Sequence, residues 1–237
     1  MTRNELIKQV LPPFIFNYLL KIRNLKKRYF ALNNLDKKLE NYLNYNNGFF
    51  IELGANDGKT QSNTLYFERY RNWTGIMVEP TSHNFLKCIK NRNLATKTFC
   101  NACVSFDYKD KYVEIIYSNL MSTPLGLESD IIDPKAHTDL GTKFLEKNEV
   151  KFNFGAIART LNSIIQESNA PKVIDLLSLD VEGAELEVLK GIDFEIYSFK
   201  YMCIESRSID MITSFLKFYN YELIETLSEH DYLFKKM

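Results

Sequence analysis

The stretch FFIELGANDGKTQSNTLYFERYRNWTGIMVE, residues 49–79, decides the fold of this chain. An apolar run is followed by a glycine-bearing turn, a helix-like stretch and a second apolar run. This order predicts a strand, a tight loop, a helix and a second strand of a parallel sheet. Gly54 lets the backbone turn sharply and approach a ligand, Asn56 tolerates positive φ, and Gly58 admits the following helix closely. The pattern is typical of half of a nucleotide-binding site.

Glu79 ends the second apolar run, about twenty residues beyond the loop, where a carboxylate can accept hydrogen bonds from both ribose hydroxyls of a nucleoside. The loop spacing is G-x-x-x-G, whereas a dinucleotide site with its pyrophosphate needs G-x-G-x-x-G. Glu52 and Asp57 would also repel a pyrophosphate, but they suit a ligand that carries an ammonium and a sulfonium. The predicted cofactor is therefore S-adenosylmethionine, with S-adenosylhomocysteine as its product, and a nicotinamide dehydrogenase is disfavoured.

Four separate blocks carry a resemblance to a known family: ELGANDGKTQSNTLYFE (52–68), NWTGIMVEP (72–80), FLKCIKNR (85–92) and LLSLDVEGAELEVLKG (176–191). They resemble the FkbM family of S-adenosylmethionine-dependent methyltransferases. Members of this family methylate mainly hydroxyls of sugars and natural products, so the resemblance implies an O-methyltransferase acting on a hydroxyl of a sugar, glycoconjugate or related small molecule. Some relatives are known chiefly as trafficking or interaction proteins, which leaves a non-catalytic binding module as the alternative.

The pattern beyond residue 48 predicts an α/β fold, because continuous apolar strands alternate with helices and indicate a parallel sheet covered on both faces. The resemblance implies a class I methyltransferase, Rossmann-like fold with a mostly parallel seven-stranded sheet that a C-terminal β-hairpin closes. We expect strands at 49–53, 75–79, 98–105, 112–117, 173–179 and 201–204, a hairpin within 221–237, and helices at 60–70, 82–91, 157–167, 184–189 and 209–219.

The chain divides into two predicted parts. Residues 1–46 read as an N-terminal helical extension, interrupted at Pro12-Pro13, and residues 47–237 form the predicted methyltransferase domain. Within that domain, residues 119–155 carry no recognisable motif and are too long for a plain connector. We therefore expect a variable substrate loop or lid there.

Ligands of open α/β sheets bind at the carboxyl ends of the strands, so the residues after each strand form the candidate site. By resemblance, the residues that hold the methionine and ribose ends of the cofactor are Glu52, Gly54, Ala55, Asn56, Asp57, Gly58, Glu79 and Pro80. Ser62 and Asn63 begin the first predicted helix, where they could contact the cofactor carboxylate or only cap the helix. Asn101 and Ala102 border the adenine edge, and Asp180 lies beside the methyl group.

Asp180 and Glu182 are two carboxylates that follow the strand predicted at 173–179. Methyl transfer needs an acceptor oxygen that loses its proton, and a carboxylate can accept that proton. His137, in the stretch without a motif, is a further candidate base. Alternatively, Asp180, Glu182 and Glu205 could bind Mg²⁺, which prefers oxygen ligands, although the sequence does not favour a metal. A third interpretation is that the two acids only cap and solvate the next helix.

The 237-residue chain is 45% apolar and has a formal charge of zero. Met1–Leu35 carries seven Lys/Arg and one acidic residue, which leaves six more acidic than basic residues in the remainder. Such a remainder is a poor surface for a polyanion, so no nucleic-acid partner is predicted. The basic segment has apolar residues at helical spacing and could associate weakly with an anionic membrane surface or pack on its own domain.

Four cysteines, Cys88, Cys100, Cys103 and Cys203, are scattered along the chain. Cys100 and Cys103 form C-x-x-C inside a predicted strand, where residues three apart point to opposite faces, so a shared metal or a disulfide is disfavoured. The sequence shows neither a secretory signal nor an apolar run long enough to span a bilayer. These observations predict a cytoplasmic protein that touches membranes, if at all, through its basic segment.

Overall fold

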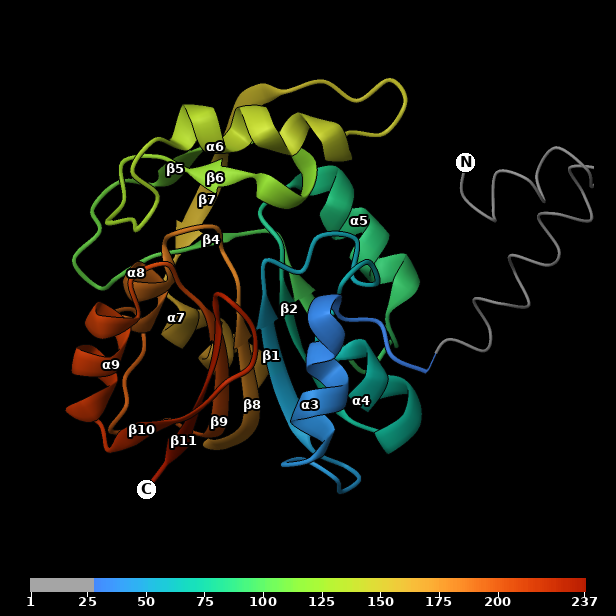
Figure 1. Cartoon of the computed structure of the whole chain (residues 1–237), viewed down its shortest axis with the longest axis vertical. Coiled ribbons are helices and arrows are strands. Elements are labelled where there is room, and N and C mark those ends of the chain that lie inside the picture. Colours follow the sequence, from blue (N-terminus) through green and yellow to red (C-terminus); the bar gives the residue numbers. More distant parts are fainter. Residues whose placement is uncertain (1–27) are drawn as a thin grey trace, which may run out of the picture.

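The computed structural model describes residues 28–237 (Figure 1). Its strands are β1 (Phe49–Leu53), β2 (Thr74–Val78), β3 (Lys97–Phe99), β4 (Ala102–Cys103), β5 (Tyr112–Tyr117), β6 (Thr123–Pro124), β7 (Phe152–Arg159), β8 (Val173–Leu179), β9 (Ser198–Glu205), β10 (Tyr221–Thr226) and β11 (Asp231–Lys236). Its helices are α3 (Leu35–Glu40), α4 (Leu65–Arg71), α5 (Ser82–Asn91), α6 (Pro134–Gly141), α7 (Leu161–Ser168), α8 (Glu185–Leu189) and α9 (Ile209–Lys217), with short 3₁₀ helices η1 (Leu32–Asn34), η2 (Asn119–Met121) and η3 (Thr142–Phe144).

The main sheet has seven strands in the order β10-β11-β9-β8-β1-β2-β3. The five strands from β9 to β3 run parallel to one another, β11 runs antiparallel to β9, and β10 and β11 form a terminal antiparallel pair. The predicted α/β fold with a mixed sheet is confirmed. Because β1 lies between β2 and β8, the loops that follow these three strands meet at one edge of the sheet.

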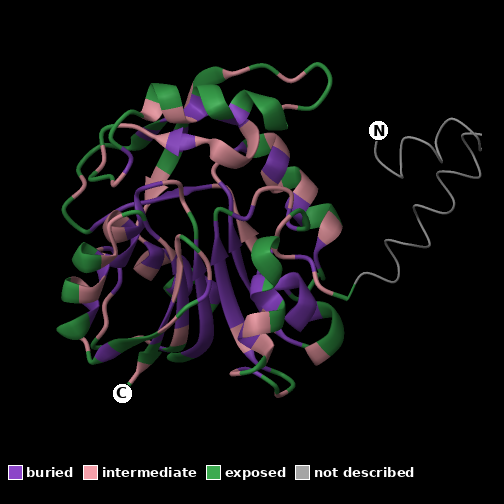
Figure 2. Ribbon diagram, in the orientation of Figure 1, coloured by how far each residue is buried: buried purple, intermediate pink, exposed green. Residues whose placement is uncertain are grey.

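Side chains of the central strands alternate between two cores, one on each face of the sheet. Ile51 and Ile76 pack on one face with α7, α8 and α9. Phe50 and Met77 pack on the other face with α3, α4 and Cys88 of α5. Figure 2 shows the central strands almost entirely buried between the two helical layers. Burial on both faces explains the continuous apolar runs of the sequence.

A second sheet of four strands, in the order β4-β7-β5-β6, lies above the carboxyl edge of the main sheet in Figure 1. β4 pairs parallel with β7, and β5 pairs antiparallel with both β6 and β7. The chain between β5 and β7, residues 118–151, is called the insertion below. It contains η2, β6, α6 and η3, so the stretch without a motif has its own regular structure.

Several predicted elements differ from the structure in extent. The predicted helix 60–70 begins only at Leu65, and the predicted strand 201–204 extends from Ser198 to Glu205. The predicted strand 98–105 is divided, because β3 ends at Phe99 in the main sheet and β4 begins at Ala102 in the second sheet. The predicted helix 157–167 begins only at Leu161, because residues 157–159 belong to β7, which pairs with β5 up to Ile157 and with β4 at Ala158 and Arg159. Thr160 directly follows that strand and caps α7 by accepting a hydrogen bond from the Ser163 amide at 3.2 Å.

The predicted N-terminal helical extension is described only in part. Residues 28–46 contain η1 and α3, and Phe30, Leu35 and Leu39 are buried against α4 and the main sheet. The remainder of the prediction, on residues 1–27, lies outside the described residues. Within residues 28–237, no helix combines the length and apolarity needed to cross a bilayer.

Candidate active site

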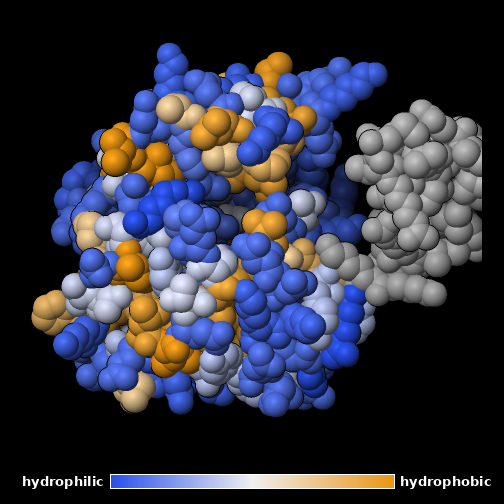
Figure 3. All heavy atoms as spheres, viewed as in Figure 1, coloured by the Kyte–Doolittle hydropathy of each residue, from blue (hydrophilic) through white to orange (hydrophobic). Residues whose placement is uncertain are grey.

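A cavity of about 330 Å³ opens where the loops after β1, β2 and β8 meet. Its roof comes from the insertion, through Leu120, Met121 and Phe144. Ile132 and Leu140 of the insertion are exposed, and Figure 3 shows orange patches in the upper part of the molecule. The predicted residues that line the cavity are Glu52, Gly54, Ala55, Asn56, Ser62, Asn63, Glu79, Pro80, Asn101, Ala102, Asp180 and Glu182.

The loop after β1 has the conformation that its sequence predicts. Gly54 has φ +72° and Asn56 has φ +46°, both in the left-handed region. The amides of Gly54 and Ala55 donate to the carbonyl of Val78 at 3.2 Å each. These bonds hold the loop against the end of β2, with its backbone facing the cavity.

Glu79 is the best-defined acceptor of the cavity. Its two oxygens accept the backbone amides of Asn56 and Thr81, each at 2.8 Å. The residue is 5% exposed, and this burial raises the pKa of Glu79 to about 7, although the two amide bonds oppose the shift. The carboxylate lines the cavity, where it can also accept hydrogen bonds from a ligand.

Glu52 lines the cavity, but neighbouring protein groups occupy both of its oxygens. One oxygen accepts the Asn63 amide at 2.9 Å, and the other accepts the hydroxyls of Ser62 at 2.9 Å and Thr64 at 2.5 Å. Arg92 also contacts the second oxygen, at 3.1 Å. Glu52 therefore holds the loop in place, and its charge is balanced inside the protein.

Two asparagines present buried acceptors at the cavity wall. Asn63, in the loop before α4, and Asn84, on α5, each have an Oδ1 atom without a hydrogen-bond partner among residues 28–237. Asn63 donates to the hydroxyl of Ser178 at 3.0 Å. A buried unpaired acceptor is costly, so both amides suit a ligand that brings N–H or O–H donors.

The predicted adenine edge is also at the cavity wall. Pro80, Asn101 and Ala102 all line it, and the Asn101 amide donates to the carbonyl of Ile157 at 3.2 Å. This bond crosses from the end of β3 to the second sheet. Asn101 thus stands where the two sheets meet over the cavity.

Three predicted site residues lie outside the cavity wall that residues 28–237 form. Asp57 caps its own turn, since its carboxylate accepts the amides of Lys59 at 2.8 Å and Thr60 at 2.6 Å. Gly58, with φ +75°, packs against Cys88 of α5 and not, as the sequence predicted, against the helix that directly follows it. His137 lies behind Glu182, as described below.

Three carboxylates gather at the ends of β8 and β9. Asp180, Glu182 and Glu205 each offer an oxygen within 4.8 Å of the other two. Asp180 is accessible, and the space that it faces is the cavity. Removal from bulk water, followed by the charge of Glu205, raises the pKa of Asp180 well above that of a free carboxyl group. Burial also raises the pKa of Glu182, against the opposing effect of His137.

Two basic side chains lie beside this acidic cluster. His137 of α6 lies 2.8 Å from a Glu182 oxygen. Arg207 lines the cavity and lies 3.5 Å from the same oxygen and 3.3 Å from an oxygen of Glu205. The three acids have the oxygen donors that Mg²⁺ prefers, but a cation would compete here with Arg207 and His137. The sequence analysis did not single out Arg207 or Asn84.

The interpretation of Asp180 and Glu182 as helix caps is wrong. Ala184 occupies the N-cap position of α8. Glu185, the next residue, instead accepts the amides of Val181 at 2.9 Å and Gly183 at 3.2 Å. The carboxylates of Asp180 and Glu182 are therefore available to the cavity and to the basic groups around it.

A comparison with protein-family models found a match. A family model described as "Methyltransferase FkbM domain" matches residues 52–234. The matched range contains the three carboxylates Asp180, Glu182 and Glu205, and it also contains Glu52 and the whole loop after β1. The search of curated proteins returned no match.

Proposed function

The chain belongs to the FkbM methyltransferase family, and we propose that it is an S-adenosylmethionine-dependent O-methyltransferase acting on a hydroxyl of a sugar, glycoconjugate or related small molecule. The observation that carries the proposal is the Glu79 carboxylate, held by two backbone amides at the rim of a cavity beside the glycine loop. The main sheet supports it further, because five parallel strands closed by an antiparallel pair are the arrangement expected of a class I methyltransferase.

The donors and acceptors of the cavity suit S-adenosylmethionine. Glu79 can accept both ribose hydroxyls. Asn63 and Asn84 offer buried oxygens to N–H groups of the methionine and adenine ends. Carboxylates outnumber basic groups on the wall, so the surroundings favour an ammonium and a sulfonium over a pyrophosphate.

The bound cofactor would supply an electrophilic methyl group on sulfur. Asp180 would accept the proton of the acceptor hydroxyl, since its raised pKa makes it a better base than an ordinary aspartate. Glu205 contributes to that raised pKa through its charge. Arg207 and His137 contact Glu182 and so offset part of the repulsion among the three acids.

The roof of the cavity supports a small polyhydroxylated acceptor. Leu120, Met121 and Phe144 give it apolar area for the C–H faces of a ring, while Lys143 and Arg207 offer hydrogen-bond donors to hydroxyl oxygens. Most small-molecule sites combine an apolar wall with a few polar groups in this way.

Calorimetry tests the cofactor, and label transfer tests the reaction. We expect S-adenosylmethionine and S-adenosylhomocysteine to bind and NAD not to bind. Incubation of candidate acceptors with isotopically labelled S-adenosylmethionine, followed by mass spectrometry, should find the label on an acceptor oxygen. Cofactor binding without label transfer to any hydroxyl compound would favour the non-catalytic alternative, and tighter binding of NAD would contradict the proposal.

A further inference from the structure

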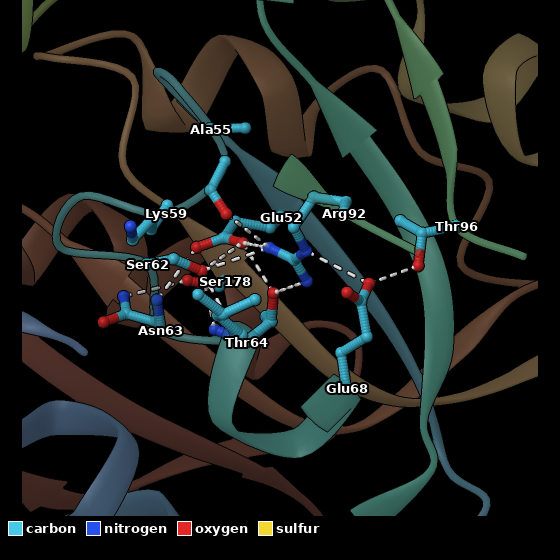
Figure 4. Close-up of polar contacts among 12 residues, drawn as sticks. Glu52, Ala55, Lys59, Ser62, Asn63, Thr64, Glu68, Arg92, Thr96 and Ser178 are labelled. Atoms are coloured by element: carbon cyan, nitrogen blue, oxygen red, sulfur yellow. Dashed lines mark hydrogen bonds and ion pairs between the residues drawn. The ribbon is translucent and has the colours of Figure 1, made fainter. Parts of the chain in front are cut away.

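Arg92 is a fully buried arginine directly behind the predicted cofactor loop. It stands at the C-cap of α5, and its side chain is 1% exposed. Figure 4 shows its guanidinium group between the carboxylates of Glu52 and Glu68, which lie 3.1 Å and 3.0 Å away. Two buried carboxylates thus share one buried cation.

On the loop side, Arg92 binds groups that surround the cavity. It donates to the hydroxyl of Ser62 at 3.2 Å, to that of Thr64 at 2.8 Å and to the carbonyl of Gly58 at 3.3 Å. Together with Glu52, these contacts fix both ends of the loop between β1 and α4. Only a planar guanidinium group has enough donors in a fixed arrangement to bind all these acceptors at once.

On the far side, the network continues away from the cavity. Glu68 of α4 also accepts the hydroxyl of Thr96 at 2.5 Å and the amide of Asn93 at 3.0 Å. Arg92 therefore joins the end of α5 and the chain before β3 to the loop. Since a buried charge is costly unless it is paired, removal of Arg92 would leave two unpaired carboxylates and disturb this whole region.

We propose that Arg92 is a positioning residue for the cofactor site. It holds Glu52, Ser62 and the Gly58 carbonyl together, and so it keeps the backbone of residues 54–63 in the conformation that receives the ligand. The inference rests on the proposed function for the identity of that ligand. The inference goes beyond the proposed function, because it assigns the shape of the loop to Arg92, whose side chain is not part of the cavity wall that residues 28–237 form.

The test compares cofactor affinity with stability in matched variants. Arg92→Met removes the cation, and Arg92→Lys keeps the charge but not the planar set of donors. Asp175→Asn is the control. Like Glu52, Asp175 is a buried acid, and it accepts the amide of Phe49 in β1 at 2.7 Å. Phe49 lies at the opposite end of β1 from Glu52. Calorimetry with S-adenosylhomocysteine and thermal unfolding are measured for each variant.

We expect all three variants to lose thermal stability, and Arg92→Met to weaken S-adenosylhomocysteine binding by about tenfold or more, the scale of a stranded buried hydrogen bond. Arg92→Lys should fall in between, while Asp175→Asn should keep its affinity within about twofold. Unchanged affinity in a folded Arg92→Met or Arg92→Lys protein would overturn the inference. If Arg92→Met fails to fold, Arg92→Lys carries the test.

A double variant separates position from charge. Glu52→Gln with Arg92→Met leaves no unpaired charge at Glu52, so thermal stability should recover in part while affinity stays low. Recovery of affinity would mean that Arg92 only cancels charge, which contradicts a positioning role.

Amide hydrogen exchange without ligand completes the design. Residues 54–63 should exchange faster in Arg92→Met than in Asp175→Asn. If the unmodified protein does not bind S-adenosylhomocysteine, the proposed function fails, yet exchange still decides whether Arg92 orders the loop.

Discussion

The backbone oxygen of Asp180 lies where the side chain of any residue other than glycine at position 54 would begin. The loops after β1 and β8 therefore touch through their main chains, directly beneath the cavity. This contact brings the predicted cofactor loop next to the predicted base. It also makes Gly54 necessary for two separate reasons, its positive φ and its lack of a Cβ.

Gly54→Ala should damage both folding and cofactor binding. Gly126→Ala is the matched control, because Gly126 has the same φ of +72° but no described atom within 4 Å of a Cβ built there. The control should lose roughly 1–2 kcal/mol, the cost of a left-handed conformation with a side chain. Gly54→Ala should lose clearly more, and S-adenosylhomocysteine binding should weaken strongly. Thermal unfolding and calorimetry measure both effects, and equal losses in the two variants would refute the argument.

Cofactor binding should release protons near neutral pH. Burial raises the pKa of Glu79 to about 7, so much of the carboxyl group is protonated at pH 6.5 in the free protein. Ribose hydroxyls donate best to the ionised form, so binding should lower that pKa and expel a proton. Affinity should therefore rise with pH up to about 7. Calorimetry in two buffers of different ionisation enthalpy counts the protons, and Glu79→Gln should abolish the release.

The raised pKa of Glu79 also affects how the stability of the free protein depends on pH. A carboxyl group whose pKa is higher in the folded than in the unfolded state makes the free protein less stable as pH rises from about 4.5 to 7. Glu79→Gln should flatten this part of the stability profile, measured by denaturant unfolding. A variant profile as steep as that of the unmodified protein would show that other buried acids, such as Glu185, dominate the slope.

Asp180→Asn should separate chemistry from binding. The amide cannot accept the proton of an acceptor hydroxyl, so turnover should fall on the order of a hundredfold or more. S-adenosylhomocysteine affinity should change little, because the contact of Asp180 with the loop is made by its backbone. Turnover is measured with the acceptor that label transfer identifies. Full activity in the asparagine variant would exclude Asp180 as the base.

Chelation tests the role of a divalent cation at Asp180, Glu182 and Glu205. Because Arg207 already lies beside these acids, where a cation would compete with it, we expect activity to survive EDTA. Loss of activity in EDTA with recovery on adding Mg²⁺ would instead assign the cluster to a metal.

A deletion of residues 1–27 tests whether the basic N-terminal segment associates with membranes. Phe30 and Leu35 are buried in the core, so a deletion that extends to Leu35 would mix membrane and folding effects. If the segment associates with membranes, deletion of residues 1–27 should abolish co-sedimentation with anionic liposomes and leave thermal stability unchanged. The association should weaken with salt, because charges are screened over about 10 Å at 0.1 M. A loss of stability without any liposome binding would show that the segment packs on the domain.

The sequence predicted the central strands well, because burial on both faces leaves a mostly apolar run such as VIDLLSL of β8. It failed where the chain changes sheets. Residues 98–105 look like one strand, but the chain leaves the main sheet after Phe99, and Asn101 bridges to the second sheet. Such a crossing depends on a partner strand more than forty residues later, which a local pattern does not contain.

In the candidate site, the sequence predicted which residues follow the strands, but it did not predict their hydrogen-bond and ion-pair partners. Glu79 and Asp180 follow apolar runs, so the topology places them at the cavity. Glu52 looked like a ligand, but its oxygens face Ser62 and Arg92. Arg92 carries no local signal, since a lone arginine in a polar helix end usually faces water, and its carboxylate partners lie far back in the chain.

Tyr117 and Phe152, the residues on either side of the insertion, are paired across β5 and β7. The two ends of the insertion are therefore adjacent in space, and the insertion leaves and re-enters the fold at one place. Closing a longer or shorter segment between adjacent ends changes the chain entropy only slightly. The insertion could therefore be exchanged by grafting, provided that the new segment keeps an anchor such as Asp130, which accepts the amides of Arg207 at 2.6 Å and Ser208 at 3.1 Å. One cofactor platform would then serve many acceptors.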